Sequence, residues 1–157
     1  MADTTDILLC GKSPVYELIE KMIAAASSPF RSKRIHIGCD EAKGIGTGKH
    51  LKLSQQYNSP TDIFVKHVSQ VIAICQKYGL KPLMWSDMVV SRKPDEKIES
   101  VVENFMATNK VDLVYWDYYN VDVKTYSVRL KKHLEAVVVC SDIGRTDQNR
   151  LRRTITM

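Results

Sequence analysis

The sequence has no long apolar run and no closely spaced pair of cysteines, and each absence excludes a class of protein. No apolar segment approaches the ~18 residues that a membrane-spanning helix needs. The four cysteines, Cys10, Cys39, Cys75 and Cys140, form no Cys-x-x-Cys pair. This spacing favours reduced thiols over a disulfide framework or a structural zinc site. The first residues also lack the basic start and apolar core of a signal peptide, so we expect a cytoplasmic protein with no membrane partner.

The most basic segment of the chain contains no aromatic residue. The formal net charge is +5, and residues 143–157, with four Arg and one Asp, supply +3 of it. A nucleic-acid surface needs basic residues spread over one face, together with aromatic or polar side chains that read the bases. We therefore interpret this segment as a solvated terminus and expect no nucleic-acid partner.

Helical and strand-like patterns alternate along the chain. Ser13-Pro14 and Ser59-Pro60 each place a capping hydroxyl before a proline, which is typical of a helix start. The predicted elements, in chain order, are a helix from Ser13 to Pro29, a strand at 34–38, a helix from Ser59 to Gly79, a strand at 81–87, a helix from Pro94, a strand at 111–119, a helix from Asp122 to about His133, and a strand at 136–140. Helices between strands return the chain to the same edge of a sheet, so an α/β fold with parallel strands is predicted.

Three of the predicted helices carry an apolar stripe at helical spacing, which is expected to be buried. In the first helix the stripe consists of Val15, Leu18, Ile19, Met22, Ile23 and Ala26. In the second it consists of Ile63, Phe64, Val68, Val71, Ile72 and Cys75. In the third it consists of Ile98, Val101, Val102 and Phe105.

Acidic and aromatic residues follow the first three predicted strands. The carboxyl ends of parallel strands meet at one edge, which is where α/β folds carry out chemistry. The residues delivered there are Asp40, Glu41, Trp85, Ser86, Asp87, Trp116, Asp117, Tyr118 and Tyr119. Aromatic rings pack on the C–H faces of sugars, and carboxylates accept hydrogen bonds from hydroxyls. A glycosidase also needs a carboxylic acid that protonates the leaving oxygen. Glu41, with the longer reach of the adjacent pair, is the candidate.

Three segments resemble family 20 glycoside hydrolases, the β-N-acetylhexosaminidases, and most closely the hexosaminidase D-like branch. They are RIHIGCDEA at 34–42, KPLMWSDM at 81–88 and LVYWDYY at 113–119. The His-x-Gly-x-Asp-Glu motif is specific to the family, and the resemblance extends over about residues 3–134. It implies a (β/α)8 TIM-barrel fold, no cofactor, and catalysis with retention in which the 2-acetamido oxygen of the substrate attacks the anomeric carbon. The implied partner is a glycan that carries N-acetylhexosamine.

The resemblance also implies a role for individual residues. By position, Glu41 matches the general acid/base, and Asp40 matches the acid that orients the acetamido group and stabilises the oxazolinium ion. The matching substrate-binding residues are Trp85 and Trp116 as pocket walls, Asp117 as an acceptor of a sugar hydroxyl, and Tyr119 as the donor to the acetamido carbonyl. Cys39 stands where many relatives have Gly.

The number of predicted strands differs from that of a whole barrel. A (β/α)8 barrel needs about 250 residues and eight strands, whereas the pattern predicts four. We therefore expect residues 1–134 to be about half of a catalytic barrel, and residues 135–157 to be a divergent end. The function predicted is hydrolysis of terminal β-linked N-acetylhexosamine. The alternative is a catalytically inactive fragment, or a carbohydrate-binding remnant, of such an enzyme.

Two other kinds of site fit the sequence less well. KGIGTGKH at 43–50 departs from the phosphate-binding loop, because Lys43 replaces its first Gly and His50 its final Ser or Thr. We interpret it as a flexible loop over the site. A metal site would have to combine His36, Cys39, Asp40, Glu41 and His50. His36 is more often a satisfied buried histidine in such a strand, so no metal is expected.

Overall fold

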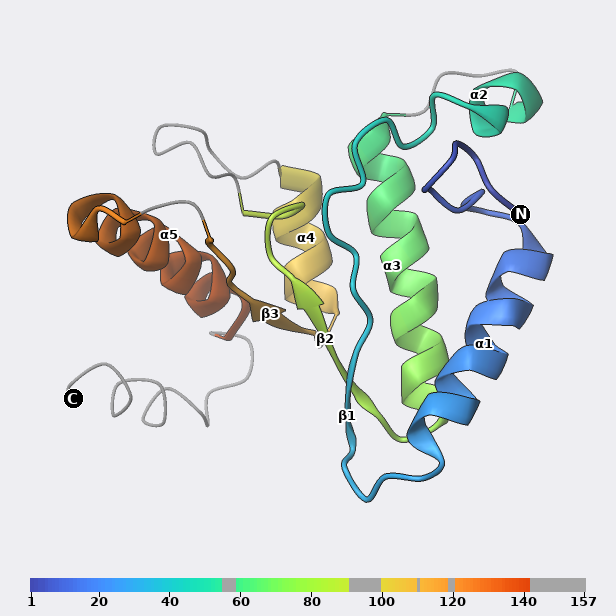
Figure 1. Cartoon of the computed structure of the whole chain (residues 1–157), viewed down its shortest axis with the longest axis horizontal. Coiled ribbons are helices and arrows are strands. Elements are labelled where there is room, and N and C mark those ends of the chain that lie inside the picture. The colour runs from blue at the N-terminus through green and yellow to red at the C-terminus, as the bar shows by residue number, and fades with distance from the viewer. Residues whose placement is uncertain (55–58, 91–99, 110, 119–120, 142–157) are drawn as a thin grey trace.

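The computed structural model of the chain describes residues 1–54, 59–90, 100–109, 111–118 and 121–141 (Figure 1). Their elements are α1 (Ser13–Ser27), β1 (Arg34–His36), α2 (Lys49–Ser54), α3 (Pro60–Lys77), β2 (Lys81–Trp85), α4 (Ser100–Thr108), β3 (Asp112–Val114) and α5 (Val123–Ser141). Among these residues, no helix combines the length and the hydropathy of a membrane-spanning segment. The fold class is mixed α/β, as the alternation of helices and strands predicts.

The three strands form one parallel sheet in which β2 lies between β1 and β3. The register pairs His36 with Leu83 and Trp85 with Val114. The hydrogen bonds continue beyond β1, where the Trp85 N–H donates to the Gly38 carbonyl at 3.0 Å. Strands that follow one another in the chain are therefore neighbours in the sheet, and their carboxyl ends lie at the same edge.

The helices form a layer beside the sheet. α3 packs against α1 on one side and α4 on the other, and α4 packs against α5 (Figure 1). Met84 of β2 and Val68 and Ile72 of α3 belong to one apolar cluster, and each is at most 1% exposed. The main core therefore lies where β2 meets α3, directly behind the strand ends.

Helix α3 agrees with its predicted start, end and buried face. The Asp62 N–H donates to Ser59 Oγ at 3.0 Å, so Ser59 is the N-cap. Gly79 has a φ of 65° and its N–H donates to the Gln76 carbonyl at 2.9 Å, as in a glycine-ended helix. The six residues of the predicted stripe are all buried.

Helix α1 departs from its prediction in two ways. It begins at Ser13, but the N-cap is Lys12 and no side chain caps the helix. Val15 and Ile23 of the predicted stripe are buried, whereas Leu18 and Met22 are 37% and 60% exposed. Helix α1 packs against α3. Because a single neighbouring helix covers a narrower face of α1 than the apolar stripe occupies, part of the stripe stays exposed.

The C-terminal strand prediction is wrong. Residues 136–140, which are predicted to form a strand, continue helix α5. The helix is capped where the sequence indicates, since the Thr125 N–H donates to Asp122 Oδ2 at 2.8 Å. No Gly or Pro interrupts residues 123–141, so no local signal ends the helix, and the weak strand preference of valine does not suffice to end it.

The structure tests part of the prediction for helix α4. Val102 and Phe105 are buried, as predicted. The proposed start at Pro94, together with Ile98, lies outside the described residues.

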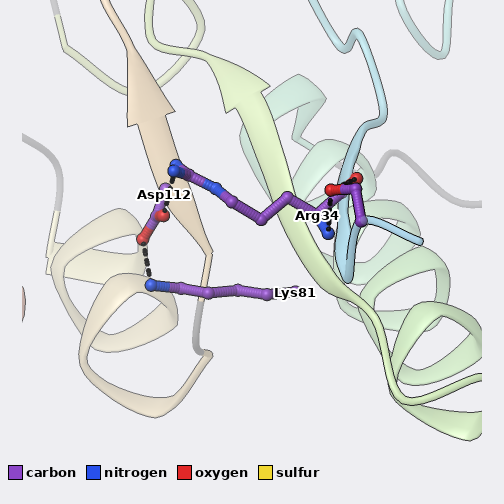
Figure 2. A network of polar contacts seen from close by, with 4 residues as sticks. Arg34, Lys81 and Asp112 are labelled. Atoms are coloured by element: carbon purple, nitrogen blue, oxygen red, sulfur yellow. Dashed lines mark hydrogen bonds and ion pairs between the residues drawn. The ribbon is translucent and has the colours of Figure 1, made fainter. Parts of the chain in front are cut away.

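A carboxylate bridges the amino ends of the three strands. Asp112 of β3 accepts from Arg34 Nη2 of β1 at 3.0 Å and pairs with Lys81 Nζ of β2 at 3.0 Å (Figure 2). All three side chains are at least one-third exposed, so the pairing contributes little to stability.

Candidate active site

The opposite edge of the sheet gathers the predicted site residues that the structure describes. The residues present there are Asp40 and Glu41 after β1, Trp85 at the end of β2, and Trp116 and Asp117 after β3. The prediction that three strand ends share one edge is therefore confirmed. Tyr119, the predicted donor to the acetamido carbonyl, lies outside the described residues.

The main chain that carries the acid pair has an unusual conformation. Gly38, Cys39 and Glu41 have φ values of 73°, 68° and 44°. The left-handed region costs a residue with a side chain about 1–2 kcal/mol, and such strain concentrates at functional sites. Glycine carries none of this cost, so the conformation of the main chain at position 39 would suit a glycine better than the cysteine that stands there. Asp40 and Glu41 are both exposed, and so are open to a ligand.

Asp87 links the ends of all three strands. It stands two residues beyond Trp85 in the middle strand. Its Oδ2 accepts the Glu41 backbone N–H at 2.9 Å, and its Oδ1 accepts the indole N–H of Trp116 at 3.0 Å. The carboxylate therefore contacts both the main chain of the catalytic candidate and one of the predicted pocket walls.

Aromatic rings flank this edge on two strands. The Trp85 ring lies against the His36 ring, with centroids 4.5 Å apart. Trp116 lies beside Tyr118, with centroids 5.4 Å apart. His36 is exposed, so its expected burial is wrong: alternation along β1 places Ile35 toward the helices and His36 on the other face. Its Nδ1 accepts the Gly38 N–H at 3.1 Å.

Asp117 is held from the helix side of the sheet. Its Oδ2 accepts the Tyr115 hydroxyl at 3.0 Å and pairs with Arg129 Nη1 of α5 at 3.0 Å. The Asp117 side chain is 4% exposed and that of Arg129 is 26% exposed. Burial, together with the adjacent Asp117, raises the pKa of Tyr115 to about 12, so this hydroxyl stays protonated and donates at neutral pH.

Residues 1–144 match the family model described as the glycosyl hydrolase family 20 catalytic domain. The chain belongs to glycoside hydrolase family 20. It is also 31% identical to hexosaminidase D of Homo sapiens over 91 residues, which cover 55% of this chain and 18% of that protein. The family 20 chain thus spans less than a fifth of the length of this curated relative.

The segment that follows the acid pair in this family 20 chain is fastened to the N-terminus. Asp3, which is 5% exposed, accepts the Gly46 N–H at 2.9 Å and the His50 N–H at 2.6 Å. Its carbonyl accepts the Lys49 N–H at 3.1 Å. The segment expected to be a flexible loop is therefore an anchored one. A Cβ at Gly48 would stand 2.1 Å from the Asp3 carbonyl oxygen, so close packing requires this glycine.

The described part of the family 20 chain offers no grouping of three or more His, Cys, Asp and Glu side chains that could hold a metal ion. Cys39 lies beside the acid pair, but burial and then the charge of Asp40 raise the pKa of its thiol to about 12. Because the thiolate is the reactive form, this raised pKa lowers the reactivity of the thiol at neutral pH.

Sequence reasoning missed two residues that shape this edge. The sequence places Asp87 at the end of a strand but indicates no role for it, and it indicates no role for Asp3. An acid two positions after a strand-end tryptophan could have indicated Asp87. Nothing near Asp3 in the sequence indicates its partners, which lie more than 40 residues away.

Proposed function

We propose that this chain carries the catalytic residues of a β-N-acetylhexosaminidase, which removes terminal non-reducing N-acetylhexosamine with retention. The observation that carries the proposal is the Asp40–Glu41 pair. It is exposed at the carboxyl edge of a parallel sheet, and Asp87 connects Glu41 to the aromatic residues of that edge. Membership of family 20 supports the reaction class.

Glu41 acts first as an acid and then as a base in the proposed reaction. Its carboxyl proton moves to the glycosidic oxygen while the bond from that oxygen to the anomeric carbon breaks. The acetamido oxygen of the same sugar forms the new bond to that carbon, giving a positively charged oxazolinium ion. Glu41, now a carboxylate, then takes a proton from water. The water oxygen attacks the anomeric carbon on its original face while the bond from that carbon to the acetamido oxygen breaks, which regenerates the neutral acetamido group and restores the β configuration.

Asp40 supports the internal nucleophile. Its carboxylate accepts the acetamido N–H, which turns the acetamido oxygen toward the anomeric carbon, and its negative charge stabilises the oxazolinium ion. Adjacent side chains diverge, so the two carboxylates serve different atoms. The left-handed φ of Glu41 supports this division, because it changes the direction in which the second side chain leaves the main chain.

The remaining predicted residues bind the sugar. Trp85 and Trp116 form apolar walls around the acetamido group, Asp117 accepts a sugar hydroxyl, and Tyr119 donates to the acetamido carbonyl. Oδ2 of Asp117 accepts the Tyr115 hydroxyl and the Arg129 guanidinium, and these contacts hold the carboxylate in place. The substrate class is a glycan or glycoconjugate that ends in N-acetylhexosamine. The cytoplasmic location stays a prediction.

The three parallel strands are proposed to be part of a (β/α)8 barrel. Sequential strand order and helices between the strands support this, since both are required of the barrel. The proposed division of the chain, with residues 1–134 as about half of the barrel, stays a prediction.

The second candidate function is sugar binding without turnover. It is favoured by the site as described, which rests on three strands, whereas a whole barrel would surround the sugar. In this case the acid pair would hold the acetamido group, but the anomeric carbon would not be positioned for attack.

One experiment separates these candidates. The 157-residue chain and its Glu41→Gln variant are incubated with the 4-nitrophenyl β-glycosides of N-acetylglucosamine and N-acetylgalactosamine. Turnover by the unmodified chain, with the β-anomer formed first in proton NMR, supports the first candidate. An α-anomer formed first would contradict the mechanism. Calorimetric binding of a thiazoline analogue of the oxazolinium ion without turnover supports the second candidate, and the absence of both overturns both.

A further inference from the structure

Asp87 is the side chain that joins the strand ends on which the proposed site stands. It follows β2, the middle strand, and its two oxygens accept one N–H from each neighbouring strand end, that of Glu41 and that of the Trp116 indole. We propose that Asp87 is a positioning residue, which acts through Glu41 and holds the acid and the Trp116 wall in their relative arrangement. The inference rests on the proposed function, because it assigns the acid role to Glu41.

The carboxylate chemistry suits two N–H donors. An ionised carboxyl group only accepts hydrogen bonds, and its two oxygens can each meet one donor. Both bonds are assisted by charge, and so are stronger than bonds between neutral groups. An asparagine at this position would offer one acceptor oxygen and an NH2 group. Because that NH2 group is itself a donor, it could not satisfy the second N–H.

The support under Asp87 is rigid. The preceding N–H groups extend the sheet, since Trp85 donates to Gly38 and Ser86 donates to the Val114 carbonyl at 3.0 Å. The N–H groups of Val89 and Val90 both donate back to the Ser86 carbonyl, and both valine side chains are buried. The carboxylate therefore projects from a main chain that is fixed on both sides, as a positioning group requires.

Glu41 needs this support because its main chain is strained. Its φ of 44° is unfavourable for a residue with a side chain. Relaxation would change the direction of the Cβ, and with it the position of the carboxyl group. A displacement of about 1 Å in a reacting group costs roughly 100-fold in rate. Two hydrogen bonds oppose this relaxation. Asp87 accepts the N–H of Glu41, and the Lys43 N–H donates to the carbonyl of Glu41 at 2.6 Å.

Asp112 provides a matched control at the far edge of the sheet. It is also a carboxylate that contacts both other strands, through Arg34 and Lys81 (Figure 2). Its removal therefore tests whether the loss of any carboxylate that bridges the strands disturbs the site. If Asp87 has the specific role proposed here, Asp112→Asn leaves Glu41 and Trp116 unchanged.

The first experiment does not depend on turnover. The ¹⁵N-labelled chain contains two tryptophans, so the indole N–H signal of Trp116 is assigned by comparison with Trp85→Phe. In Asp87→Asn, at least one of the Trp116 indole and Glu41 amide signals should shift. Hydrogen exchange at the broken bond should accelerate roughly ten- to hundredfold, the factor expected for a charge-assisted hydrogen bond. Asp112→Asn should change neither signal.

Kinetics supply the second readout. With an alkyl β-N-acetylglucosaminide, Asp87→Asn should lower kcat by roughly 10- to 100-fold. It should change KM less, and the loss should be smaller for a nitrophenyl glycoside, because a good leaving group needs less acid assistance. If Asp87 were merely structural, the factor by which Asp87→Asn lowers kcat per folded molecule would be the same for both leaving groups.

These readouts decide the proposal separately from the function. Unchanged Glu41 and Trp116 signals in Asp87→Asn, or equal changes in Asp112→Asn, overturn the positioning role. Absence of turnover in the unmodified chain contradicts the proposed function, while the two signals still decide whether Asp87 holds Glu41. If Asp87→Asn does not fold, Asp87→Glu replaces it. This variant keeps the charge, but its extra methylene displaces the oxygens, so at least one signal should again shift.

Discussion

Arg129 of α5 pairs with Asp117 at the end of β3, with its Nη1 3.0 Å from the carboxylate oxygen. The two residues join the last described helix to the candidate site. Because the Asp117 side chain is 4% exposed, contacts with protein groups such as Arg129 and Tyr115 stabilise its charge in place of water. This ion pair therefore belongs to a different class from the exposed pairs at the amino edge of the sheet.

Replacement of Arg129 by Met should destabilise the chain substantially. The change removes the guanidinium that pairs with this buried carboxylate, and we expect a loss of about 1.5–3 kcal/mol, the range for hydrogen bonds to charged groups. Arg34→Met is the matched control. Arg34 is 60% exposed and contacts the partly exposed Asp112, so about 0.5 kcal/mol or less should be lost. Urea denaturation measures both, and equal losses would contradict the distinction.

Exchange of each proposed catalytic carboxylate should produce a different dependence on the leaving group. In Glu41→Gln, kcat for alkyl glycosides should fall by roughly 10²–10⁴-fold, the usual contribution of a general acid. The loss should be smaller for nitrophenyl glycosides. In Asp40→Asn, all N-acetylated substrates should slow by similar factors, because oxazolinium stabilisation does not depend on the leaving group. The same dependence in both variants would show that the division of roles is incorrect.

Cys39 should tolerate glycine better than alanine. Its φ of 68° penalises any side chain, so Cys39→Gly should be more stable than Cys39→Ala by about 1 kcal/mol. Glycine is normally the less stable of the two in regular structure, so the order itself is the test. Thermal unfolding of both variants measures it. If alanine were the more stable residue, the left-handed conformation at this position would be incorrect.

Acid should destabilise the chain partly through His133. Burial lowers its pKa from the usual 6.5, so the folded chain keeps it neutral when the unfolded chain already binds a proton. Stability is therefore lost as the pH falls from about 6.5 towards the lower folded pKa. His133→Phe should reduce this loss in urea midpoints measured between neutral and mildly acidic pH. His67, whose pKa is also lowered by burial, should account for part of the remaining loss.

Local signals predict the elements well where they are complete. α3 has a capping serine, a glycine at its end and a continuous apolar stripe, and all three are found in the structure. α1 shows the limit of a stripe, since Leu18 fits the helical spacing but is exposed. Burial depends on how many neighbours cover a helix, and the spacing of apolar residues contains no information on that number.

In the candidate site, too, the features that depend on local sequence were predictable, whereas contacts between distant residues were not. Strand ends are local features, so the edge with Asp40, Glu41 and Trp85 was predictable from helix–strand alternation alone. The bond between Asp87 and Glu41 joins residues 46 positions apart and depends on strand register. A single sequence specifies that register only through packing. For the same reason, the partner of Asp117 on α5 was not predicted.

The contact between Asp3 and residues 46–50 has a consequence for processing and engineering of the chain. Its carboxylate and carbonyl accept three N–H groups from the segment just after the acid pair. The Leu9 N–H donates to the Met1 carbonyl, so residues 1 and 9 are also hydrogen-bonded to each other. A protease that trims these residues, or a purification tag fused before them, would therefore act on the neighbourhood of the proposed catalytic pair. The environment of Asp40 and Glu41 is thus sensitive to changes at Asp3, more than 35 residues away in the sequence.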